Sequence, residues 1–210
     1  MTEDLELQPA VAEQFSALAE LLSDATDAVW NTESLCDGWR VLEVVAHMTM
    51  PARYSQDEFM AELESCGYDF TRLSNEIAVR DARLPPARLV ADLRSDVLHH
   101  WTPPGVDFHG ALNHVVIHSL DVTVPLDRSR LAPDETIRVI LDDLTQGGIH
   151  KHFNIDIEDR MMEASDLDWH YGTGSPLRAT AEVLALAMSG RWVSNERLEG
   201  APLRRAKASD

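Results

Sequence analysis

The sequence is poor in cysteine and in positive charge, and it contains no long hydrophobic run. Cys36 and Cys66 are the only cysteines among 210 residues, too few for the disulfide framework on which small secreted domains depend. Lysine and arginine number 18 against 36 acidic residues, a net charge of −18. Such a charge repels phosphate backbones and anionic membrane surfaces. We therefore expect no disulfide scaffold, no nucleic-acid partner and no membrane partner.

Export and membrane insertion are not indicated either. Residues 1–6 contain no basic segment that leads into an apolar stretch. Nowhere do about 18 apolar residues, the length of a membrane-spanning helix, follow one another. A cytoplasmic location is the expectation.

The sequence does contain helical periodicity. Of its residues 44% are apolar and 26% charged, as in globular proteins. Apolar side chains at spacings of three and four, with proline and glycine at the ends, predict amphipathic helices. One predicted helix starts at about residue 38, with Asp37 as the nearest residue able to cap it. The other predicted helices span about 7–30, 69–83, 85–101, 111–126 and 133–147.

The pattern changes near residue 150. Apolar and polar residues alternate from Ile149 to Tyr171, which predicts short strands. A turn at 172–176 and a helix over about 178–189 follow. The predicted class is mainly α, with a helical bundle over residues 1–150 and a small α/β region over residues 151–210 packed on the bundle.

Residues 111–126 are apolar on nearly every side of a helical wheel, which predicts the most buried helix of the bundle. The same residues are rich in valine and isoleucine, so a strand is the rival interpretation. The length of the run favours the helix, since strands usually have five or six residues.

The predicted buried helix carries a polar stripe. His114, His118 and Asp121 follow i, i+4, i+7 spacing and lie within an arc of about 60°. Burying these groups without partners would cost several kcal/mol. Two neutral imidazoles one turn apart can chelate a divalent metal, with Asp121 hydrogen-bonded behind them.

A metal site needs a third ligand, and His47 is the best candidate because it borders the apolar face of its own helix. Cys36 precedes a helix start, but we do not select it as a ligand or nucleophile. The remaining histidines are interpreted as surface residues at helix ends, in loops or in strands: His99, His100, His109, His150, His152 and His170.

Three parts of the sequence resemble a known protein family. The segment from Cys36 to His47, together with Trp30, is similar to the entry to the first metal ligand in the mycothiol-dependent maleylpyruvate isomerase family, within the DinB/YfiT-like superfamily. The pattern from His114 to Asp121 resembles its second ligand helix, and residues 166–191 resemble its C-terminal α/β region. The isomerases commonly have a carboxylate at the position of His114, whereas three histidines are closer to the DinB/YfiT branch.

The resemblance implies a DinB-like four-helix bundle of up-down-down-up type with an open metal position, served by a thiol such as mycothiol. The ligands would be His47, His114 and His118. Zinc is the first candidate, and nickel or iron would also suit imidazoles. The resemblance also suggests that Arg191 binds a carboxylate of the substrate or thiol, although an ordinary ion pair is an alternative role.

Two functions follow from these expectations. The first is a metal- and thiol-dependent isomerase or transferase that acts on a small electrophilic substrate. The alternative is a non-catalytic DinB-like protein that binds a divalent metal or small ligand, such as a stress-linked bundle. A third interpretation leaves the histidines purely structural. The chain is expected to be a monomer or a homodimer.

Overall fold

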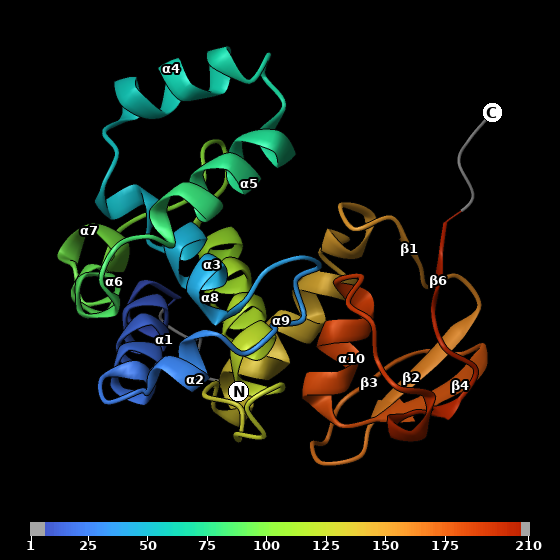
Figure 1. Ribbon diagram of the computed structural model, residues 1–210. Helices are drawn as coiled ribbons and strands as arrows, with labels where there is room; N and C mark the ends of the chain where they lie inside the picture. Colours follow the sequence, from blue (N-terminus) through green and yellow to red (C-terminus); the bar gives the residue numbers. More distant parts are fainter. Residues whose placement is uncertain (1–6, 207–210) are drawn as a thin grey trace. The chain divides into compact units, whose positions relative to one another are not determined.

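The computed structural model describes residues 7–206. The chain divides into two compact units, and the boundary in the sequence lies between Leu131 and Ala132. The division falls earlier than the residue 150 at which the sequence pattern changes, because the helix after Leu131 packs on the last helix of the chain. Figure 1 shows the elements of both units.

The first unit is helical. Its central helix α8 packs against α1 and α3, and α5 and α6 pack on α3. In chain order its elements are α1 (Leu7–Leu22), α2 (Asp27–Trp30), α3 (Val41–Met48), the 3-10 helix η1 (Met50–Ala52), α4 (Gln56–Ser65), α5 (Phe70–Asp81), α6 (Pro86–Leu93), α7 (Asp96–His99) and α8 (Phe108–Thr123).

Helix α8 is the buried helix that the sequence predicts. The Asp107 side chain caps its start by accepting from the backbone N–H groups of His109 and Gly110. Nearly all of its residues from Ala111 to Thr123 are buried. The helical interpretation of this segment is confirmed, and the strand is excluded.

Two predicted helices are interrupted in the structure. The first ends at Leu22, and a new helix starts at Asp27. The segment predicted over 85–101 divides into α6 and α7 at Arg94, because Ser95 caps a new helix through the backbone N–H of Val97. Apolar periodicity continues across such breaks, so it does not reveal them.

Helix α4 was not predicted. It has no buried residue, and its sequence is too acidic to show an apolar stripe. Its start is marked instead by a capping box, in which Ser55 accepts from the backbone N–H of Glu58 and the Glu58 carboxylate accepts from that of Ser55. In Figure 1, α4 lies beside α5 at the edge of the unit.

The second unit contains the predicted α/β region. Its sheet has the order β3-β2-β4-β5, with β2 and β4 parallel and the outer pairs antiparallel. Helix α10 packs on α9 and contacts β2 and β4. The elements are α9 (Asp134–Thr145), η2 (Ile149–Lys151), β1 (Ile155–Asp156), β2 (Arg160–Ala164), β3 (His170–Gly172), β4 (Ser175–Ala179), α10 (Ala181–Met188), η3 (Asn195–Arg197), β5 (Glu199–Gly200) and β6 (Arg204–Arg205).

The mainly α class with a small C-terminal α/β region is confirmed. Strands β1 and β6 form a separate antiparallel pair. Among the described helices, none combines the length and the apolar character needed to cross a bilayer.

Candidate metal centre

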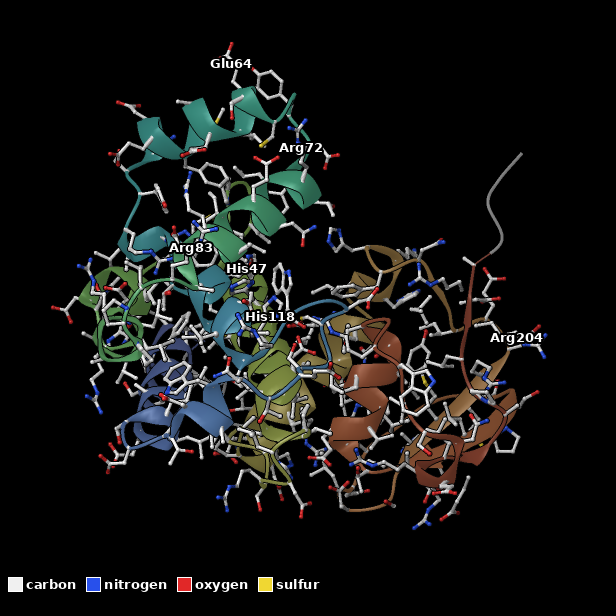
Figure 2. All side chains as sticks on the ribbon, in the orientation of Figure 1. His47, Glu64, Arg72, Arg83, His118 and Arg204 are labelled. Atoms are coloured by element: carbon white, nitrogen blue, oxygen red, sulfur yellow. The ribbon has the colours of Figure 1, made fainter. Side chains whose placement is uncertain are left out.

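Three histidines from two helices meet inside the first unit. His47 lies in the last turn of α3, and His114 and His118 lie one turn apart on α8. Their ring centroids are 4.8 to 5.3 Å apart, and one nitrogen of each lies within 4.8 Å of the other two. Figure 2 labels His47 and His118 on these helices. The structure thus brings together all three predicted ligands.

The residues fit a divalent metal. Three protein nitrogens with room for one further ligand are typical of catalytic zinc sites, and imidazole also suits nickel, iron and copper. Tetrahedral coordination at zinc–nitrogen distances near 2.0 Å places the nitrogens about 3.3 Å apart. Small side-chain rotations bring atoms within 4.8 Å of one another to that separation. His47 is buried, and His114 and His118 are half-buried.

Asp121 fixes the orientation of one imidazole. Its carboxylate is fully buried, and Oδ2 lies 2.9 Å from Nδ1 of His118. A carboxylate only accepts, so the ring donates from Nδ1 and its lone pair is left on Nε2. The contact between Asp121 and His118 has the geometry by which proteins usually set the tautomer of a metal-binding histidine, and the role of Asp121 behind a metal ligand stays a prediction.

Cys36 lies closer to this cluster than the sequence analysis expects. Its Sγ is 3.0 Å from Asp121 Oδ2 and 3.7 Å from His118 Nδ1. Cys36, His118 and Asp121 therefore form a second group of side chains that could hold a metal ion, and this group shares His118 with the first. No residue spacing indicates this contact in advance, because Cys36 and Asp121 are 85 residues apart in the chain.

Two tryptophans border the histidines and were not predicted as site residues. The Trp39 ring lies 5.2 Å from that of His47, and the Trp101 ring 5.4 Å from that of His114. Trp39 is held by a hydrogen bond from Nε1 to Oδ1 of Asn75 on α5. These rings provide apolar surface next to the imidazoles, which lowers the local polarity.

The start of α3 is set by an ion pair. The helix begins at Val41, so its cap is Arg40 and not the predicted Asp37. The Glu43 carboxylate accepts from the backbone and side-chain N–H groups of Arg40. Burial disfavours the charged form of Glu43, but these hydrogen bonds outweigh it and hold the pKa of the carboxyl below its ordinary value of 4.5.

The end of α3 is held by Arg53. This side chain, only 8% exposed, forms ion pairs with Asp81 of α5 and Asp92 of α6. It also donates to the backbone oxygen of Ala46 and to the hydroxyl of Thr49. The carbonyls at the end of a helix need such donors, so Arg53 joins the helix that carries His47 to two neighbours.

Other predicted residues lie elsewhere. Arg191 belongs to the second unit, where its guanidinium donates to the backbone oxygen of Ser189 and lies 5.6 Å from the Phe153 ring centroid; its binding role stays a prediction. His150 was interpreted as a surface residue, which is wrong, because it is buried and Nδ1 contacts the backbone oxygen of Leu144. His109 lies in the first turn of α8 and not in a loop.

The chain combines a helical unit, in which three imidazoles from two helices meet, with a small α/β unit that follows it in sequence. Residues 11–100 match the family model of the mycothiol maleylpyruvate isomerase N-terminal domain. The resemblance predicted from the sequence is confirmed. The matched segment includes His47 and ends before α8.

Two solved structures have the same fold. They are the mycothiol-dependent maleylpyruvate isomerase and a mutant of that enzyme in which alanine replaces a histidine. Each covers 93% of this chain and 92% of its own, with a TM-score of 0.56 and 16% sequence identity. No curated protein matches the sequence.

Proposed function

We propose that this protein is a metal-dependent enzyme that uses a low-molecular-weight thiol, of the mycothiol type, to isomerise or transfer a small electrophilic substrate. The observation that carries the proposal is the convergence of His47, His114 and His118 within 4.8 Å in a chain whose residues 11–100 match the mycothiol maleylpyruvate isomerase domain. The proposed ion is zinc.

The three imidazoles are the proposed ligands. Because neutral histidines add no negative charge, a bound ion would keep its full positive charge and would lower the pKa of a thiol in its fourth position, so that the thiol is held as thiolate at neutral pH. His118 would be oriented by Asp121, and the rings of Trp39 and Trp101 would keep the surroundings apolar.

The proposed reaction is an addition followed by an elimination. The thiol sulfur forms a bond to one carbon of an activated double bond, and the electron pair of that bond moves into the neighbouring carbonyl. Rotation about the resulting single bond and expulsion of the sulfur restore the double bond in the other geometry. The thiol is regenerated, so an isomerase of this type needs no oxidant or reductant. In a transferase the sulfur would instead displace a leaving group and remain on the product.

The test is a thiol-dependent rate. Protein purified without an affinity tag is analysed for metal, loaded with one equivalent of zinc, and assayed with unsaturated keto acids in the presence of mycothiol, glutathione or no thiol. We expect turnover that requires the thiol and falls at least about a hundredfold in His47→Ala. His100→Ala is the control, because that histidine lies exposed at the end of α7, and it should retain full activity.

Two results would contradict the proposal in different ways. Stoichiometric metal binding without any thiol-dependent rate would favour the non-catalytic metal-binding alternative. Full metal retention in a His114→Ala, His118→Ala double variant would remove the metal centre from both interpretations.

A further inference from the structure

The segment that carries Cys36 is held in place by several backbone hydrogen bonds. Glu33 and Arg40 form an antiparallel bridge across it. Within it, Ser34 Oγ accepts from the backbone N–H of Cys36 and donates to the backbone oxygen of Trp39. A turn from Cys36 to Trp39 is closed by a 3.0 Å hydrogen bond and has a positive φ at Gly38, which favours glycine.

The same segment is docked on α8 through the backbone oxygen of Asp121. Pro125 has no N–H, so the backbone oxygen of Asp121, four residues earlier, receives no helical hydrogen bond from it. The backbone N–H of Leu35 donates to that oxygen instead, at 3.2 Å. Cys36 is the next residue, and its thiol reaches the Asp121 side chain. The backbone and the side chain of Asp121 thus both contact the segment.

The thiol and the imidazole donate to the same carboxylate oxygen. Oδ2 of Asp121 accepts from Cys36 Sγ at 3.0 Å and from His118 Nδ1 at 2.9 Å. The carboxylate is fully buried, so each donor stabilises its charge and restricts its rotation. An alanine at position 36 would lack the sulfur and would supply no donor, whereas a serine would keep one.

We propose that Cys36 is a positioning residue of the metal centre: its thiol donates to Asp121 and holds the carboxylate in the orientation that fixes the ring of His118. The inference rests on the proposed metal site and extends it by one residue. Cys36 acts through Asp121 and does not touch the metal. Because a thiol is a weak donor, its contribution to metal affinity is smaller than that of the carboxylate.

The experiment measures zinc affinity by competition with a chromophoric chelator, independently of any enzymatic activity. Removing a hydrogen-bond partner of a metal ligand costs about ten- to a hundredfold in affinity, and this loss is expected for Asp121→Ala. Cys36→Ala should weaken zinc binding by about three- to tenfold. Cys36→Ser keeps a donor and should remain within about twofold of the unmodified protein. Cys66→Ala is the matched control, because that buried cysteine contacts Glu76, and its affinity should be unchanged.

Cobalt substitution separates a positioning role from direct ligation. Cobalt(II) bound by thiolate gives an intense charge-transfer band in the near ultraviolet. We expect no such band, and a visible ligand-field spectrum that changes in Cys36→Ala and returns in Cys36→Ser. A charge-transfer band lost in both variants would make Cys36 a ligand and overturn the inference.

Equal zinc affinities of Cys36→Ala and the unmodified protein would also overturn the inference while leaving the proposed function intact. If the unmodified protein binds no zinc, the metal site and this inference fail together.

Discussion

At the scale of single residues, Glu43 links the stability of α3 to pH. Its pKa lies below 4.5 in the folded protein because hydrogen bonds from Arg40 outweigh the effect of burial. A carboxyl with a depressed folded pKa stabilises the protein above its unfolded pKa, and that contribution is lost as the pH falls through the folded value. Glu43→Gln should therefore lower the free energy of unfolding at pH 7 by about 1–3 kcal/mol.

The measurement is urea unfolding at pH 7 and at a series of pH values below 4.5. In the acid range the difference in free energy of unfolding between the unmodified protein and Glu43→Gln should become smaller. In an Arg40→Gln background, the same substitution should cost less, because the side-chain donors to Glu43 are already gone. A difference in free energy of unfolding that stays constant across the acid range would contradict the link between Glu43 ionisation and stability.

Single residues also show what the sequence could predict of the site. His114, His118 and Asp121 were found because one helix places them on one stripe, and His47 because it borders an apolar face. Cys36 and Trp101 reach the cluster from segments whose paths depend on tertiary contacts, such as the hydrogen bond of Leu35 to Asp121. Periodicity contains no information about such paths.

At the scale of elements, Arg53 joins three helices through buried charge. Removing one partner of a buried ion pair leaves an uncompensated charge and costs about 3–5 kcal/mol. Arg53→Met should cause such a loss in the free energy of unfolding, since it leaves both Asp81 and Asp92 without this arginine. Chemical denaturation with circular dichroism measures it.

The control for this element-scale prediction is Arg72→Met. Arg72 pairs with Glu76 one turn away on the exposed face of α5, and such surface pairs contribute about 0.3–0.5 kcal/mol. Similar losses in free energy of unfolding for Arg53→Met and Arg72→Met would show that the ion pairs of Arg53 do not hold the helices together.

Elements differ in how far the sequence determines them. The helix over 111–126 was predictable because burial on nearly all sides leaves a continuous apolar run, although α8 begins at Phe108 and ends at Thr123. Helix α4 was missed because none of its residues is fully buried and only Phe59 and Leu63 pack partly against a neighbouring buried cluster. The break between α6 and α7 was missed because Ser95 acts through a local hydrogen bond that leaves the apolar pattern unchanged. Boundaries set by caps require a search for capping residues.

At the scale of the whole molecule, the net charge of −18 predicts a dependence of stability on salt. Repulsion among acidic groups destabilises the folded chain, and ions screen it. Raising sodium chloride from about 0.02 to about 0.5 M should raise the Tm by a few degrees, as measured by calorimetry.

A charge-reduced variant provides the control. Glu64→Lys and Glu158→Lys, both at exposed positions, each replace −1 by +1, so that together they change the net charge from −18 to −14. Their combination should reduce the dependence of the Tm on salt. A Tm that falls with added salt would contradict the role of charge repulsion.

Pro125 has a consequence for how the sequence can vary. Any other residue at position 125 would bring an N–H within reach of the Asp121 carbonyl and would compete there with Leu35. Positions 35 and 125 are therefore expected to constrain each other in variants of this chain, although 90 residues separate them. If α8 were lengthened by one turn, the Asp121 carbonyl would accept a hydrogen bond within the helix, and the segment before α3 would need another acceptor for the backbone N–H of Leu35.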